Sequence, residues 1–229
     1  MINPAEHRSP AAEAVPVPEV SPNNPCPFLR ALVAEGYIGG HIEPLSTIAD
    51  TVSRAGGPTR AQGRLSRKPV YLIALIANGL NPARLWRSLH QGAQLDGLRG
   101  GPLDKRGAGS RILDATGNIN EAELARLETF AVDMTDSATG RVERGLGIKQ
   151  CRAMMDANFA RAAGSRRHID RAMMNGEWPV LLKVMGKDAG RERYLSVEEV
   201  RALFAERRLP ERISRRLQGR VCTDVLNPR

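Results

Sequence analysis

A single cysteine, Cys26, stands between two prolines at the predicted start of a helix. Pro27 suits the first helical position, because proline lacks the N–H group that would find no partner there. A sulfur atom in this position faces the free N–H groups and the positive end of the helix, which both lower the pKa of a thiol. The resulting thiolate is the form that binds metal ions or attacks electrophiles. The same pattern also fits a small buried cysteine in a proline turn.

The helix that must position this cysteine is short and has a clear end. Its apolar residues recur at helical spacing, and they are Phe28, Leu29, Leu32 and Val33. Gly36 follows at the place where a helix commonly ends with a left-handed residue. The pattern therefore predicts a thiol at the N-terminus of a helix that packs one face into a core.

Apolar periodicity predicts further helices along most of the chain, which gives an all-α fold class. Strands have little support, because alternating β-branched residues are scarce. The predicted helices cover residues 42–52, 69–80, 82–91, 118–132, 146–163, 168–174, 178–185 and 196–207. Two stretches rich in Gly and Arg, 54–68 and 94–111, are predicted to be long loops, and such loops are usually functional or disordered.

The 229 residues divide into a predicted leader and one domain. Residues 1–22 are rich in Pro, Ala, Glu and Ser without a sustained apolar period, so we expect them to be flexible. Residues 23–229 are enough for a single core. The longest apolar run, 70–77, is far too short to span a bilayer. Three widely separated cysteines argue against a disulfide framework, and no secretory signal is visible, so we expect a soluble, cytoplasmic protein.

The chain is strongly basic, with 34 Lys and Arg against 25 Asp and Glu and a formal charge of +9. This charge permits attraction to nucleic acid, to an anionic membrane or to an acidic partner. One hypothesis is therefore a basic helical binding protein without a cofactor, in which pairs such as Arg166-Arg167 contact phosphates. An enzyme with a cysteine nucleophile is a further hypothesis, and it needs a histidine such as His168 to approach Cys26 in the fold. Composition does not fix the oligomeric state.

Residues 25–38 read Pro-Cys-Pro, an apolar residue and Leu, then Ala-Leu, and finally Gly-Tyr-Ile. This stretch resembles the proximal loop of the heme-thiolate peroxidases, the family of chloroperoxidase and the unspecific peroxygenases. The resemblance implies a helical heme-binding domain with heme b as cofactor and the Cys26 thiolate as axial ligand of the iron. It also implies an enzyme that uses peroxide to oxidise or oxygenate a small organic substrate. The expected intracellular location departs from the fungal members of the family, which are mostly secreted, so the chain would be a divergent member.

A second stretch, near the C-terminus, carries the same resemblance. Its residues are Phe204, Glu206-Arg207, Leu209 and Pro210-Glu211, at the end of a predicted helix. They are similar to the closing segment of the family and follow the cysteine stretch in the right order. Ser196 and Glu199, three residues apart, also predict a capping box at the start of this helix.

Residues 175–186 resemble the region in which the family places its distal acid–base group. The resemblance makes Glu177 the residue that moves a proton between the peroxide oxygens. Long family members place an arginine seven residues before this glutamate, and here Arg171 stands six residues before it. Apolar neighbours such as Trp178 would desolvate the Glu177 carboxyl, as this role requires. The alternative is a structural carboxylate that favours the positive end of a helix.

The family also carries a Glu-His-Asp or Glu-Gly-Asp triplet followed by a serine, where a divalent cation binds beside a heme propionate. By resemblance Asp133 stands for the glutamate and Ser137 for the serine, while Met134 and Thr135 depart from the motif. Such oxygen ligands suit Mg²⁺, which retains several of its waters. The alternative is a polar turn before Gly140.

Residues 114–123 look like half of a calcium-binding EF-hand loop. Placing Gly117 at the sixth position of that loop puts Ile112 at the first, where calcium needs a carboxylate. We therefore interpret the stretch as a turn followed by a capped helix.

Overall fold

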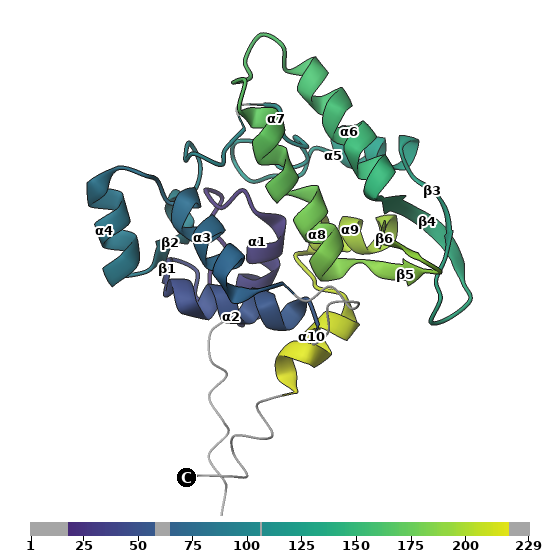
Figure 1. The fold of residues 1–229 in the computed structure, drawn as a ribbon, viewed down its shortest axis with the longest axis horizontal. Helices are drawn as coiled ribbons and strands as arrows, with labels where there is room; N and C mark the ends of the chain where they lie inside the picture. Colours follow the sequence, from purple (N-terminus) through teal and green to yellow (C-terminus); the bar gives the residue numbers. More distant parts are fainter. Residues whose placement is uncertain (1–17, 58–64, 106, 220–229) are drawn as a thin grey trace, which may run out of the picture.

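The computed structural model describes residues 18–57, 65–105 and 107–219 (Figure 1). About 51% of the structure is helical and 12% is strand, so the protein is mixed α/β and the predicted all-α fold class is wrong. Most of the predicted leader, residues 1–22, lies outside the described residues. No helix in the described part of the chain is long and apolar enough to cross a membrane.

The N-terminal half of the described chain is helical, as the sequence predicts. Its helices are α1 (Pro27–Ala34), α2 (Leu45–Ala55), α3 (Arg67–Ala77) and α4 (Pro82–His90). Two short antiparallel strands, β1 (Ile42–Glu43) and β2 (Ala93–Gln94), join the chain before α2 to the chain after α4. Gly36 has a φ of 74°, so a glycine supplies the left-handed residue that ends α1.

The helices of the C-terminal half are mostly short. They are α5 (Glu121–Ala125), α6 (Ile148–Arg161), α7 (Asp170–Met173), α8 (Trp178–Met185), α9 (Val197–Arg201) and α10 (Glu211–Gln218). Helix α9 continues as a π-helical turn, Ala202–Glu206, which ends at Arg207 in the left-handed region with a φ of 54°. The predicted helix over 196–207 is thus present only from Val197 onward.

A four-stranded antiparallel sheet is the element that the sequence did not predict. Its strands are β3 (Val132–Thr135), β4 (Val142–Gly147), β5 (Lys187–Ala189) and β6 (Glu192–Ser196), in the order β3-β4-β6-β5. Two hairpins, β3–β4 and β5–β6, join through the pairing of β4 with β6. The strands are short, and Gly145 and Gly147 interrupt the alternation that marks a strand in a sequence.

Gly145 in β4 allows the sheet to bury a large side chain. A Cβ atom at this position would lie 2.4 Å from the ring of Tyr194 on β6. Tyr194 is fully buried, and its hydroxyl donates a hydrogen bond to Glu143 at 2.7 Å. Any larger residue at position 145 would displace this ring, because the glycine marks a close approach of two strands.

One continuous apolar core joins the helices to the sheet. The core is mostly aliphatic, since only 4% of the residues are aromatic. Trp178 on α8 stacks on Phe204 with ring centroids 6.2 Å apart. This contact brings two of the segments that carry the family resemblance together.

Candidate functional site

Cys26 is the N-cap residue of α1, at the helix end where the sequence places it. The buried side chain of Asn24 accepts a hydrogen bond from the backbone N–H of Cys26 at 3.1 Å. The thiol is free, and the residue is partly buried against the core. The Asn24 turn therefore fixes the direction in which the thiol leaves the backbone.

A buried arginine holds this turn in place. Arg30, which is only 3% exposed, donates to the carbonyls of Ser21 at 3.2 Å and Gly117 at 3.1 Å. It also reaches the carbonyl of Asn24 at 3.4 Å. The segment that carries Cys26 is thus tied to the turn before α5, and the two Nη groups of this buried cation donate to backbone oxygens.

Burial and the helix N-terminus act in opposite directions on the Cys26 thiol. Burial raises its pKa, and the backbone N–H groups of Leu29 and Phe28 lower it. The net pKa lies above the usual range of a cysteine. The expected lowering of this pKa is therefore wrong for the protein without a ligand, because desolvation outweighs the N–H groups of the helix.

Two charged side chains from distant parts of the chain act on the same thiol. The negative charge of Glu177 raises the pKa of Cys26, and the positive charge of Lys105 lowers it. Lys105 Nζ lies 3.4 Å from Glu177 Oε2, so the two side chains form an ion pair. The fold thus brings Cys26, Lys105 and Glu177 together in one group, which we call the Cys26 cluster.

Sequence reasoning missed Lys105. Its one signal is its position in the loop 94–111, whose length favours a functional role. The side chain is only 15% exposed, and it also donates to the carbonyl of Leu103 at 3.2 Å. A lysine that is mostly buried needs such partners, because desolvation of an unpaired ammonium group is costly.

The Glu177 carboxylate keeps free hydrogen-bonding capacity. Its Oε2 atom is buried and accepts no hydrogen bond within the described residues, although Lys105 lies nearby. Beside it, Gly109 contributes no side chain, and a Cβ atom there would lie 3.9 Å from Glu177 Oε1. A buried acceptor without a hydrogen bond is unusual in a native structure and needs an explanation, of which a bound ligand or a catalytic role is one.

Arg171 pairs with a carboxylate other than Glu177. Its Nε atom donates to Asp156 on α6 at 2.7 Å, and its Nη1 atom reaches Asn175 at 3.5 Å. The cation that faces Glu177 is therefore Lys105, while Arg171 joins α7 to α6.

Asp133 and Ser137 each have a partner of their own. Asp133 lies on β3, is exposed, and pairs with Arg144 at 3.1 Å. The Ser137 hydroxyl accepts a hydrogen bond from the backbone N–H of Gly190 at 2.8 Å. Within the described residues, no three His, Cys, Asp or Glu side chains gather in a group that could hold a metal ion. The cation site stays a prediction.

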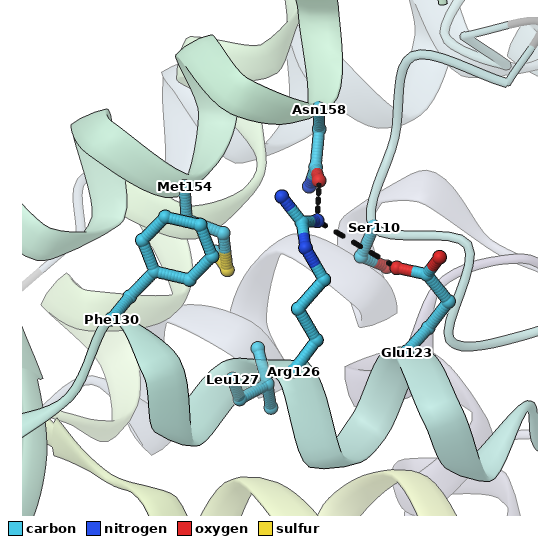
Figure 2. A pocket seen from close by; sticks show the side chains of 7 residues that line it. All are labelled: Ser110, Glu123, Arg126, Leu127, Phe130, Met154 and Asn158. Atoms are coloured by element: carbon cyan, nitrogen blue, oxygen red, sulfur yellow. Dashed lines mark hydrogen bonds and ion pairs between the residues drawn. The ribbon is translucent and has the colours of Figure 1, made fainter. Parts of the chain in front are cut away.

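The half EF-hand is a turn followed by a capped helix, as interpreted. Asp114 Oδ1 accepts hydrogen bonds from Thr116 and Asn118 within the turn, and Asn120 caps α5. Glu123, which would be the last calcium ligand of such a loop, instead accepts two hydrogen bonds from Arg161 at 2.6 and 2.8 Å. Figure 2 shows Glu123 beside Arg126, which also donates to Asn158. The guanidinium group of Arg161 thus binds Glu123 where an EF-hand loop would bind a calcium ion.

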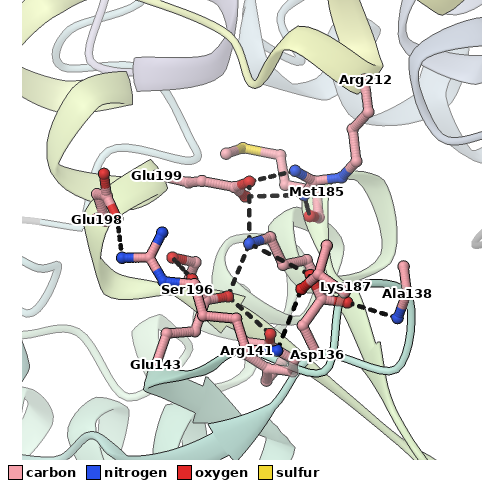
Figure 3. Close-up of polar contacts among 12 residues, drawn as sticks. Asp136, Ala138, Arg141, Glu143, Met185, Lys187, Ser196, Glu198, Glu199 and Arg212 are labelled. Atoms are coloured by element: carbon pink, nitrogen blue, oxygen red, sulfur yellow. Dashed lines mark hydrogen bonds and ion pairs between the residues drawn. The ribbon is translucent and has the colours of Figure 1, made fainter.

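A second polar group lies at the sheet, around Lys187 (Figure 3). Its ammonium group lies 2.7 Å from Glu143, 3.6 Å from Glu199 and 3.8 Å from Asp136. Arg212 on α10 donates hydrogen bonds from both Nη atoms to the two carboxylate oxygens of Glu199. These ion pairs tie β5 to β4, α9 and α10.

The predicted capping box of α9 is wrong, and the Lys187 group explains why. Ser196 is the N-cap residue, but its hydroxyl donates to Glu143 at 3.2 Å and caps no helical N–H group. Glu199 is held by Lys187 and Arg212. A tertiary hydrogen bond of Ser196 and the tertiary ion pairs of Glu199 therefore replace the local capping interactions of both side chains.

A polar hollow of about 250 Å³ opens beside the Lys187 group. Its rim carries both signs of charge, and Arg141 lies 3.9 Å from Glu198. Arg208 pairs with Glu206 at 2.8 Å. The charges of the rim thus largely compensate one another.

The two segments with the strongest family resemblance lie together in the fold. Glu35, just after α1, accepts hydrogen bonds from the Leu209 backbone N–H at 2.6 Å and the Ser214 hydroxyl at 2.8 Å. The Tyr37 hydroxyl donates to the carbonyl of Ser214 at 3.3 Å. The C-terminal segment therefore hydrogen-bonds to the residues that directly follow α1, the helix whose N-cap residue is Cys26.

No family model, curated protein or solved structure matches the chain.

Proposed function

We propose that the protein is a heme-thiolate peroxidase or peroxygenase, with Cys26 as the iron ligand and Glu177 as the acid–base group. The observation that carries the proposal is the Cys26 cluster. Cys26 and Glu177, which the resemblance makes the iron ligand and the acid–base group, act electrostatically on each other, although they come from distant parts of the chain.

The donor chemistry of the cluster suits a thiolate-bound iron. The backbone N–H groups of Phe28 and Leu29 lie at the helix N-terminus beside Cys26 and lower the pKa of its thiol, and the polar groups around such a sulfur tune an iron site. The raised pKa means that the free protein holds a neutral thiol. Coordination requires the thiolate, so iron binding releases a proton at this sulfur.

When bound, a thiolate-ligated heme supplies cleavage of the peroxide O–O bond. With the heme bound, Glu177 would take the proton from one peroxide oxygen and return it to the other, which is the task of a general acid–base group. Its buried Oε2 atom accepts no hydrogen bond from the residues that the structure describes, so it has capacity to accept that proton. Lys105 positions the carboxylate through the ion pair. Partial burial of both side chains limits the access of water.

The visible absorption spectrum of protein produced with heme available tests this function. We expect a Soret band whose ferrous–CO form is red-shifted in the manner of a thiolate ligand, and we expect Cys26→Ala to abolish that signature. Cys151→Ala is the matched control, because Cys151 is fully buried in α6 and keeps its proton, with a pKa raised to about 12 by burial. Protein that stays colourless and binds no added heme would overturn the proposal and favour a binding protein without a cofactor.

A further inference from the structure

Helices α3 and α4 and the turn between them expose a group of large apolar side chains. The group, which we call the α3–α4 surface, consists of Leu72, Ile73, Leu80, Trp86 and Leu89. Their exposed fractions run from 36% for Ile73 to 60% for Trp86. Scattered apolar residues are normal on a protein surface, whereas these five come from two successive helices and the turn between them, which favours an interaction site.

Helix α4 buries a polar residue and exposes large apolar ones, the reverse of an ordinary surface helix. Its one buried residue is Ser88, while Trp86 and Leu89 face outward. In α3 only Val70 is buried, although the helix is almost entirely apolar. A helix that packs on a core in water buries its apolar side and exposes its polar side. These two helices therefore present apolar side chains to something other than the core.

The α3–α4 surface lies in the longest part of the chain without acidic residues. No Asp or Glu occurs between Asp50 and Asp96. The basic residues in this stretch are Arg54, Arg60, Arg64, Arg67, Lys68, Arg84 and Arg87. Arg84 and Arg87 are exposed on α4, on either side of Trp86. Arg67 pairs with Asp50, while Lys68 on α3 is exposed like the two arginines of α4. The surface thus combines apolar side chains with a local excess of positive charge.

The geometry points to a docking surface for an anionic lipid bilayer, and we propose that α3 and α4 lie in its headgroup region. Tryptophan is favoured at that depth because its ring is apolar while its N–H group stays wet. Long basic side chains extend toward the lipid phosphates while their stems lie against apolar surface. An apolar face flanked by Lys and Arg is the signature of a helix that binds such an interface.

An apolar, basic surface could also bind a second copy of the chain or a nucleic acid, and charge and apolar contact distinguish these partners from a bilayer. A second copy of the chain would place like charges opposite one another, which disfavours association. A nucleic acid would satisfy the arginines but leave Leu72, Leu80 and Leu89 in water. Of these three partners, the bilayer is the one that accommodates both the positive charge and the apolar side chains. In Figure 1, α4 lies at the edge of the molecule away from the four-stranded sheet, as docking requires.

The chain contains its own probe for this contact. Of its two tryptophans, Trp178 is 1% exposed and Trp86 is 60% exposed. We expect phosphatidylcholine vesicles that contain phosphatidylserine to shift the emission of Trp86 to shorter wavelength and to carry the protein into the pellet. Brominated lipids should quench this emission in the unaltered protein. Pure phosphatidylcholine and high salt should weaken binding, since salt screens the charges.

Paired variants separate the two contributions. Trp86→Ala with Leu89→Ala should weaken vesicle binding about a hundredfold, because two large apolar side chains no longer enter the interface. Val142→Ala with Ile169→Ala removes comparably exposed apolar side chains, at 61% and 53%, and should leave binding unchanged.

The charge variants have the same design. Arg84→Gln with Arg87→Gln should weaken binding at least about tenfold. Arg152→Gln with Arg191→Gln alters two arginines that are exposed elsewhere and should have little effect.

Three results would overturn the proposal. One is vesicle binding that survives the Trp86/Leu89 change. Another is a Trp86 emission shift with duplex DNA and none with vesicles. The last is a dimer mass by light scattering, without vesicles, that the same variant reduces to a monomer.

Discussion

The Cys26 thiol and the Glu177 carboxylate each lie where burial disfavours the charged form of the side chain, while neighbouring groups favour it. The helix N–H groups favour a thiolate at Cys26, while burial raises its pKa and keeps it neutral. Glu177 has an ion-pair partner in Lys105, but in the described part of the chain its buried Oε2 atom accepts no hydrogen bond. Neither arrangement is the one that stability alone would favour, and residues of this kind are common at functional sites.

Replacement of Glu177 by Gln tests the role of its carboxylate. We expect the Soret band to remain and turnover with peroxide to fall about a hundredfold, because an amide cannot exchange the proton. Glu192→Gln, an exposed carboxylate on β6, is the control and should match the unaltered protein. Equal turnover in Glu177→Gln and in the control would remove Glu177 from the reaction.

Helix α7 shows how one short element depends on a buried carboxylate. Asp170 is fully buried at its start, where it accepts hydrogen bonds from Arg167 N at 2.8 Å and Arg167 Nε at 2.7 Å. Arg167 also donates to the carbonyls of Pro102 and Asp104 at 3.1 and 2.8 Å. This pair therefore holds the loop that carries Lys105 against α7.

The Asp170 interaction should make stability depend on acid pH. Burial raises the pKa of Asp170, but the hydrogen bonds from Arg167 outweigh it and the net pKa is lowered. A carboxylate with a lowered pKa stabilises the fold above its unfolded pKa of about 4, and this contribution is lost as the pH falls through the folded pKa. We expect Asp170→Asn to cost about 2 kcal/mol at pH 7.

Urea unfolding of both proteins at neutral and acid pH measures this effect. The difference between Asp170→Asn and the unaltered protein should shrink on acidification. A difference that stays constant across the pH range would contradict the assignment.

At the scale of the whole molecule, charged groups rather than apolar contacts alone join the sheet to the C-terminal helices. Lys187 lies among Glu143, Glu199 and Asp136, and Arg212 on α10 binds Glu199. Both cations are mostly buried. Such a network stabilises only while every member is present, because an unpaired buried charge is costly.

Removal of Lys187 tests this network. We expect Lys187→Met to lower the free energy of unfolding by about 3 kcal/mol, since it leaves buried carboxylates without their cation. Lys183→Met, at an exposed position on α8, is the matched control and should change stability little. Equal unfolding midpoints for the two variants would show that the network carries no stability.

The sequence by itself determined the local features of this protein. It predicted the N-terminal helices, the end of α1 at Gly36 and the position of Cys26 at a helix start. These follow from periodicity and from the backbone preferences of proline and glycine, which act within a few residues.

The tertiary structure alone decided the sheet and the partners of charged side chains. Strand β4 forms because β3 and β6 supply its hydrogen bonds, and β6 lies about fifty residues further along the chain. The ion pairs of Lys105 with Glu177 and of Arg171 with Asp156 also depend on the tertiary structure. The same holds for the hydrogen bond from Ser196 to Glu143, which replaces the predicted cap. An ion pair depends on distance in space, and no local pattern in a sequence encodes that distance.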